Sequence, residues 1–226
     1  MRRRQLRSFS LPQNLHFDTK TGYVLDSLRT AILVGDILPG SRITEQQIRD
    51  ALNVSSSPVR EAFHQLEAEG LLTRNPHVGT TVTSMDIEDA KELYRIQSVL
   101  QGSAVQICTK KLKEEDIREA ERLNKEMRRS VGKKNGPKRL RVANYKLHML
   151  LCGINVYPWL TRLISGLWIL FPTHSYWVLP NRPMVSIQQH EEVIEAVKQR
   201  NEVQAGSLMR KHLESSMQAL YGNRST

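Results

Sequence analysis

The sequence is short of cysteine, aromatic residues and long apolar runs. It holds only two cysteines, Cys108 and Cys152, which excludes a disulfide framework and a metal site built from paired cysteines. Aromatic residues make up 6% of the chain, so a core must depend mainly on aliphatic side chains. The most apolar segment, residues 163–171, is far shorter than the roughly 20 residues of a membrane-spanning helix. We therefore expect reduced, buried thiols, a cytoplasmic protein and no membrane partner.

Acidic residues are outnumbered by basic ones, which favours an anionic partner. Lys and Arg together number 33 against 23 Asp and Glu, and the formal net charge is +10. A charge of this sign and size points to nucleic acid first and to an anionic membrane surface second. Residues 1–16 are basic and then polar, and no apolar stretch follows them as it would in a signal peptide. We predict a basic N-terminal arm there.

Residues 17–84 are predicted to form a module of three helices and a hairpin. Apolar residues at helical spacing between Val24 and Ile32 predict the first helix. The second helix opens at Thr44, and Gln47 stands three residues later at capping-box spacing.

One of the serines 55–57, most simply Ser57, is predicted to be the N-cap of the third helix, with Pro58 at the first helical position. Residues 71–74 and 80–83 are rich in strand formers and flank a turn, which predicts a two-stranded hairpin. Only a short turn separates the second and third helices, so the third can enter a DNA major groove while the second crosses the backbone. The alternative is an ordinary helical bundle with a hairpin, in which the Ser-Pro pair only caps a helix.

The start of the third helix carries residue types that suit DNA. Small hydroxyls there can approach phosphates, assisted by the helix dipole and free backbone N–H groups, and Arg60 can reach a base edge or a phosphate. Residues 1–84 carry 10 Lys and Arg against 8 Asp and Glu, so the net positive charge of this module is small. DNA binding must therefore depend on where the basic residues lie and on the presence of two such modules in a dimer. The predicted DNA-binding residues are Arg42, Thr44, Gln46, Ser55, Ser56, Ser57, Arg60, His77 and Gly79.

Residues 85–226 have helical periods throughout, which predicts an all-helical domain. We expect one of its helices to begin at Ser186, whose Gln189 has capping-box spacing. Four polar residues lie on or beside the apolar stripes of three of these helices and could meet: Asn144, His148, His190 and His212. Neutral imidazoles with an oxygen ligand suit Zn, Ni or another first-row divalent ion. The alternative is that each histidine is satisfied separately in the core.

Three segments of the first module carry a recognisable pattern: residues 37–43 (ILPGSRI), 52–62 (LNVSSSPVREA) and 66–72 (LEAEGLL). Together they resemble the GntR family of bacterial transcriptional regulators. This resemblance implies a winged helix-turn-helix and a homodimer that binds a palindromic operator. Residues 86–221 look like the ligand-binding domain of the FadR-type subgroup, called FCD, which is an antiparallel helical bundle. In that subgroup an Asp or Asn and three His hold a metal, and small carboxylate effectors commonly complete its coordination; the corresponding residues here are Asn144, His148, His190 and His212.

Four positions depart from the family's usual charged residues. Gln46 and Ser56 stand where members often carry Arg, which predicts an operator with fewer Arg–guanine contacts. Gln97 and Gln101 stand where members often carry Arg and Glu, which predicts a less acidic or differently bound effector. The candidate effector-pocket residues are Gln97, Gln101, Arg141, Trp168 and His174.

The sequence thus predicts a mainly α protein: a winged helix-turn-helix in residues 17–84, then an all-α antiparallel bundle in residues 85–226 for ligand binding and dimerisation. The predicted function is a ligand-responsive transcriptional repressor that binds double-stranded DNA as a homodimer. A small-molecule effector and a divalent transition metal, Zn or Ni, are expected in the bundle. Two alternatives stay open: a metal-dependent hydrolase that uses the histidines, and a regulator whose pocket holds no metal. A hydrolase needs a general base beside the metal-bound water, and residues 190–193 (HEEV) do not form an H-E-x-x-H motif.

Overall fold

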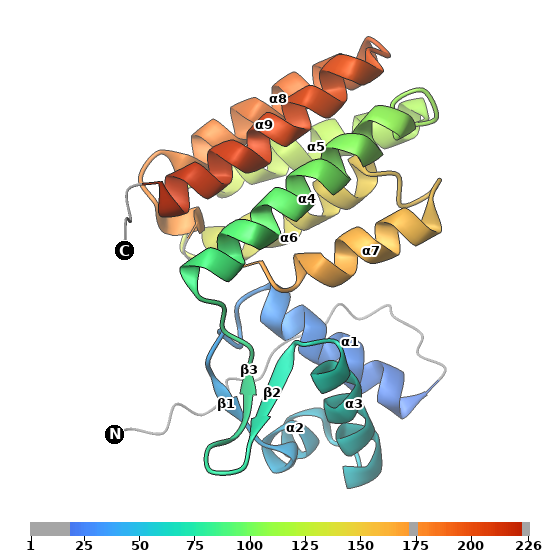
Figure 1. Ribbon diagram of the computed structural model, residues 1–226. Coiled ribbons are helices and arrows are strands. Elements are labelled where there is room, and N and C mark those ends of the chain that lie inside the picture. The colour runs from blue at the N-terminus through green and yellow to red at the C-terminus, as the bar shows by residue number, and fades with distance from the viewer. Residues whose placement is uncertain (1–18, 172–175, 223–226) are drawn as a thin grey trace. The chain divides into compact units, whose positions relative to one another are not determined.

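Helices make up most of the chain (Figure 1). The computed structural model describes residues 19–171 and 176–222, and the chain divides into two units, residues 1–84 and 85–226. The predicted basic arm, residues 1–16, lies outside the described residues. In the described part of the chain, no helix is both long and apolar enough to cross a membrane.

In its described residues, 19–84, the N-terminal unit contains three helices and a small sheet (Figure 1). We expected a two-stranded hairpin, but the sheet has three antiparallel strands in the order β1-β3-β2. The added strand β1 has two residues, too few to show the alternating pattern that predicts a strand. The elements are α1 (Lys20–Leu33), β1 (Arg42–Ile43), α2 (Glu45–Leu52), α3 (Ser56–Ala68), β2 (Leu72–Asn75) and β3 (Gly79–Val82).

Helix α2 starts at a side-chain cap, whereas α3 starts without one. The capping box at α2 is confirmed: Thr44 Oγ1 accepts from the Gln47 backbone N–H, and the Gln47 side chain accepts from the Thr44 backbone N–H. For α3 one of the three predicted serines is the N-cap, but it is Ser55 and not the favoured Ser57, and the helix begins at Ser56. Pro58 then lies in the first turn, where its missing N–H costs no intrahelical hydrogen bond.

Aliphatic residues and one phenylalanine form the core of this unit. Helix α1 packs on α3, and α2 packs on α3. On α1 and α3 the buried residues recur three or four apart, so each of these helices turns one apolar face inward, while α2 buries Ile48. The fully buried side chains include Leu28, Ile48, Val59, Phe63 and Leu66.

In its described residues, 85–171 and 176–222, the C-terminal unit contains six α-helices and a short 3-10 helix, Tyr176–Val178 (Figure 1). Five of the α-helices close a ring, because α4 packs on α9, α9 on α8, α8 on α5, α5 on α6, and α6 contacts α4. The remaining α-helix, α7, contacts α4 and α6. The helices are α4 (Ile87–Cys108), α5 (Glu114–Ser130), α6 (Gly136–Leu151), α7 (Pro158–Trp168), α8 (Arg182–Lys198) and α9 (Glu202–Tyr221).

Helix α8 begins earlier than its sequence pattern indicated. Its first residue is Arg182 rather than a residue after Ser186, and Pro183 occupies the first turn. The predicted capping box at Ser186 and Gln189 was therefore wrong, since both residues lie inside the helix. Ser186 is buried and Gln189 is half-buried.

Both cysteines are free and buried in this unit, as expected. Burial raises the pKa of Cys108 to about 11 and raises the pKa of Cys152 as well. Both side chains are therefore neutral thiols at physiological pH.

Candidate DNA interface and metal centre

The N-terminus of α3 presents exposed polar side chains. Ser55, Ser56 and Arg60 are all exposed, and the Arg60 side chain is 64% accessible. Ser55 makes no side-chain capping hydrogen bond, so its hydroxyl is available to a phosphate. Arg60 Nε lies 3.7 Å from Glu45 Oε2, an exposed contact that contributes little and can be exchanged for DNA.

The sheet places a second group of predicted residues at one end of the wing. Gly79 has φ +92°, and a Cβ there would lie 3.2 Å from Arg42 Nε. The glycine therefore provides both the backbone conformation and the space that the Arg42 side chain occupies. His77 is exposed in the turn before Gly79, and its backbone N–H donates to Asn75 Oδ1 at 2.9 Å.

Two of the predicted DNA-binding hydroxyls already have partners within the chain. Thr44 Oγ1 caps α2, and Ser57 Oγ donates to Glu61 Oε1 at 3.2 Å. Gln46 is exposed and lies in the first turn of α2. A groove between the start of α2 and the wing is lined by Arg42, Thr44, Gln46, Arg74 and Gly79.

In the C-terminal unit, three histidines from three helices meet at one point. His148 is on α6, His190 on α8 and His212 on α9, and all three are buried. The Nε2 atom of His190 lies 3.1 Å from that of His148 and 3.2 Å from that of His212. The spacing and burial are those of a group that could hold a metal ion.

Burial keeps the three imidazoles neutral. Desolvation lowers the pKa of His148 to about 3. The pKa of His190 is lowered well below the usual value, first by burial and then by His212, His148 and Arg182. The pKa of His212 is also lowered well below the usual value, first by burial and then by repulsion from His148 and Arg182. Neutral imidazole is the form that ligates metals.

The predicted oxygen ligand, Asn144, lies one turn before His148 on α6. It is buried, and its Oδ1 has no hydrogen-bond partner among the residues that the structure describes. A buried carbonyl oxygen without a partner costs free energy unless an ion or a water molecule satisfies it. Three neutral nitrogen donors and one amide oxygen fit a borderline divalent ion such as Zn²⁺ or Ni²⁺.

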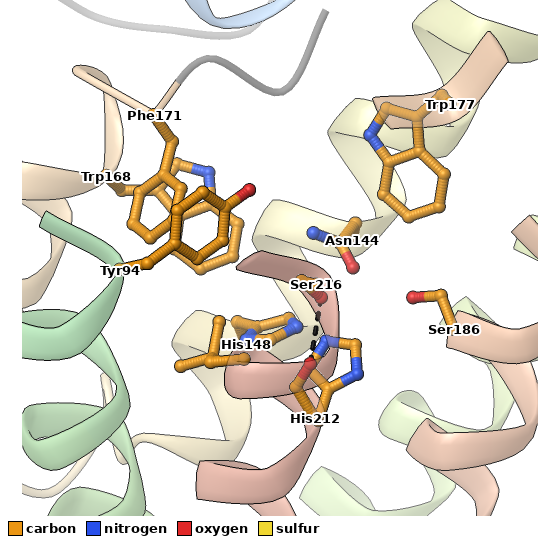
Figure 2. Close-up of a pocket in the computed structure, with 10 residues that line it drawn as sticks. Tyr94, Asn144, His148, Trp168, Phe171, Trp177, Ser186, His212 and Ser216 are labelled. Carbon is orange, nitrogen blue, oxygen red and sulfur yellow. Dashed lines mark hydrogen bonds between the residues drawn. The ribbon is translucent and has the colours of Figure 1, made fainter. Parts of the chain in front are cut away.

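A small cavity adjoins this centre (Figure 2). Its volume is about 20 Å³, enough for about one water molecule. Asn144, His148, His212 and Ser216 contribute polar walls, while Tyr94, Trp168 and Phe171 form an aromatic wall and Trp177 lies apart from these three (Figure 2). The buried Ser186 Oγ also lines the cavity and has no partner in the described part of the chain.

The predicted effector residues have different positions. Trp168 lines the cavity, and its ring centroid is 4.8 Å from that of His148. Gln97, Gln101 and Arg141 do not line it; the two glutamines are buried beside it and bonded to each other. His174 lies outside the described residues.

Sequence reasoning missed several residues around the centre. Ser216 follows His212 by four residues on α9, so helical spacing alone could have indicated it. Gln189 Oε1 lies 3.0 Å from His212 Nδ1, but the sequence position of Gln189 suggests a helix cap instead. Tyr94 and Phe171 pack edge to face with centroids 4.5 Å apart, and nothing in their local pattern marks them as cavity residues.

Comparisons with known proteins agree with this architecture. Residues 20–82 match the family described as "Bacterial regulatory proteins, gntR family", and residues 92–215 match the FCD domain. The HTH-type transcriptional regulator YdhC of Bacillus subtilis is 29% identical over 189 residues, which cover 81% of this chain and 84% of YdhC.

Two further similarities concern the fold and the first unit. The solved structure of Escherichia coli McbR superposes with a TM-score of 0.82 at 21% identity, covering 91% of this chain and 99% of McbR. The "Probable D-xylose utilization operon transcriptional repressor" of Paenarthrobacter nicotinovorans is 38% identical over 86 residues, 38% of each chain. The families and relatives are transcriptional regulators and not enzymes, so the hydrolase alternative is dropped. The chain therefore belongs to the GntR family of bacterial transcriptional regulators, with a DNA-binding helix-turn-helix followed by an FCD domain.

Proposed function

We propose that this regulator binds a palindromic operator as a homodimer and that a divalent metal in the FCD domain makes its DNA affinity responsive to a small effector. His148, His190 and His212 would hold the ion, with Asn144 Oδ1 as an oxygen ligand. The ion would supply an open coordination position for a carboxylate or another oxygen donor. The convergence of three buried, neutral imidazoles carries this proposal.

The effector would enter through the cavity beside the ion. At about 20 Å³ the cavity is too small for a metabolite, so effector binding requires its aromatic wall to move. A ligand that binds only the opened form shifts the protein towards that form. The effector then changes operator affinity, and the size of this change is set by how much more tightly the effector binds one form than the other.

The proposed repressor role is supported by the relative named a probable repressor of D-xylose utilization. That similarity covers 38% of this chain. This partial similarity supports the proposal of repression, but it does not support D-xylose as the effector of this chain.

Exposed apolar side chains on α4 and α7 support the proposed homodimer. Ile96 and Val99 on α4 are 41% and 59% exposed, and Trp159 and Leu163 on α7 are 81% and 55% exposed. Helices α4 and α7 contact each other. A second copy that covers these side chains would remove them from water.

The experiment compares metal content with operator affinity in one preparation. Full-length protein, purified without a histidine tag, is analysed for metals, and its binding to duplexes from its own genomic neighbourhood is titrated by fluorescence anisotropy. We expect about one ion per chain and an operator affinity that changes several-fold after chelator dialysis. His212→Ala should abolish both the ion and the change, whereas His64→Ala, on the exposed surface of α3, should retain the ion.

The remaining alternative is a regulator whose cavity takes an effector without metal. The same titration separates the two proposals, because that alternative predicts no stoichiometric ion and no effect of chelation on DNA binding.

A further inference from the structure

Two buried glutamines on α4 form a chain of hydrogen bonds whose direction is fixed at one end. Gln97 Nε2 donates to the backbone carbonyl of Ile164 at 3.0 Å. A carbonyl can only accept, so the NH₂ group of Gln97 must face Ile164 and its Oε1 must face the other way. Gln101 Nε2 donates to that Oε1 at 2.8 Å. The orientation of the Gln101 amide is therefore set by a backbone group on α7.

This direction determines which nitrogen of His148 carries the proton. Gln101 Oε1 lies 2.6 Å from His148 Nδ1. Since the oxygen can only accept, His148 Nδ1 must donate, and its Nε2 is left with a lone pair. That lone pair points at the centre formed with His190 and His212.

A third glutamine does the same for His212. Gln189 Oε1 lies 3.0 Å from His212 Nδ1, and Arg182 Nη2 donates to the same oxygen at 3.5 Å. Gln189 Nε2 donates to Ser215 Oγ at 3.1 Å. An arginine has no acceptor, so the oxygen must face it, and His212 must also carry its proton on Nδ1.

His190 is held differently from the other two histidines. Its Nε2 lies within 3.2 Å of two acceptor nitrogens, so in the metal-free protein it must carry the proton there and donate. Its Nδ1 is then an acceptor, and this atom has no hydrogen-bond partner among the described residues. For Nε2 to ligate an ion, the proton on His190 Nε2 must move to Nδ1, so that the imidazole stays neutral.

We propose that Gln101, oriented by Gln97, and Gln189 are positioning residues that hold His148 and His212 as Nδ1–H tautomers, so that two of the three ligand lone pairs face the centre before an ion arrives. His190 is the one imidazole of the three whose proton has to move on binding. The inference rests on the proposed metal site for its purpose, but the tautomers themselves exist without metal. Such partners of metal-bound histidines typically change metal affinity by about 10–100-fold.

The first test reads the tautomers directly. Full-length, metal-free protein labelled with ¹⁵N-histidine is studied by long-range ¹H–¹⁵N correlation NMR, and the seven histidines are assigned by single substitutions. We expect the Nδ1–H form for His148 and His212 and the Nε2–H form for His190. An Nε2–H form at His148 or His212 would overturn the proposal.

The second test removes the acceptors. Gln101→Leu and Gln189→Leu should each lose the fixed tautomer of the histidine they contact and weaken Zn²⁺ binding about 10–100-fold in competition with a chromophoric chelator. Gln101→Glu keeps an acceptor oxygen and should restore both properties. Gln188→Leu, on the exposed side of α8, is the matched control and should leave both unchanged.

The outcomes also separate this inference from the proposed function. Predicted tautomers in a wild-type protein that binds no Zn²⁺ would support the positioning role and reject the metal-dependent function. Unchanged tautomers and unchanged Zn²⁺ affinity in folded Gln101→Leu, with folding checked by circular dichroism, would reject the positioning role while the metal site stands.

Discussion

Arg60 combines an exposed side chain with a position in the second turn of the helix that is expected to enter DNA. Replacing it removes at least one contact to a base edge or a phosphate in each half-site. Arg60→Ala should therefore weaken operator binding by about 10–100-fold per half-site, at about 1–3 kcal/mol for a bidentate base contact. Gel-shift titration measures this. Arg118→Ala, an exposed arginine on α5, is the control, and equal affinities of the two variants would remove Arg60 from the interface.

The buried histidines make the stability of the metal-free FCD domain depend on pH. The folded pKa of His148 is about 3, below its usual value near 6.5, and those of His190 and His212 are also lowered. The unfolded chain therefore binds more protons, and the stability present above pH 6.5 is lost as pH falls below it. Each group that stays neutral costs about 1.4 kcal/mol per pH unit.

Urea denaturation between pH 8 and pH 5 measures this loss. The three tryptophans lie at positions 159, 168 and 177, all in the second unit, so their fluorescence reports on the FCD domain alone. The midpoint should fall steadily below pH 6.5, and excess Zn²⁺ should reduce the fall because it binds the folded state. A midpoint independent of pH in metal-free protein would contradict buried, neutral histidines.

At the residue scale, the histidines could be predicted and their partners could not. Asn144 and His148 lie four apart beside an apolar stripe, and His190 and His212 lie beside stripes of their own, so the sequence indicates that they face inward. A glutamine can cap a helix, bond to solvent or orient a histidine, and spacing does not separate these roles. The spacing of Ser186 and Gln189 therefore predicts a capping box, although Gln189 lies inside α8.

Helix α3 and the start of α2 carry the residues that should set operator sequence. Gln46 and Ser56 stand where family members often have arginine, and both are exposed. Arginine reads guanine through two hydrogen bonds that neither residue can reproduce. Selection from random duplexes should therefore yield a motif with fewer guanine contacts than the common family half-site. Recovery of that common half-site would show that these two positions do not set specificity.

At the scale of elements, helices with caps and strong periods were predictable, and irregular starts were not. The Thr44 capping box fixed the start of α2. Helix α8 begins at Arg182 because Pro183 fits the first turn, yet the Ser186–Gln189 spacing imitates a cap. Strand β1 is defined by its pairing with β3, a long-range interaction that no local pattern reports.

The proposed dimer makes a prediction for the whole molecule. Trp159 on α7 is 81% exposed, and a charge in its place would be buried at the interface. Trp159→Glu should shift the protein from dimer to monomer in sedimentation velocity and weaken operator binding about tenfold or more. Val203→Glu, at an exposed apolar position on α9, is the control. A Trp159→Glu protein that stays dimeric would place the interface elsewhere.

The convergence of the histidine centre is also a property of the whole unit. Each histidine could be placed on an inward face, but the ring of α4, α9, α8, α5 and α6 is needed to bring three Nε2 atoms together. Ring closure depends on packing between helices that are distant in sequence, so the sequence could favour a metal site without demonstrating one.

Anomalous X-ray diffraction from crystals of the protein as purified tests that centre most directly. Data collected on both sides of the zinc and nickel absorption edges should give one strong peak per chain, about 2.0–2.2 Å from the Nε2 atoms of His148, His190 and His212. A map with no peak there, from protein whose histidines are well ordered, would contradict the metal-dependent account.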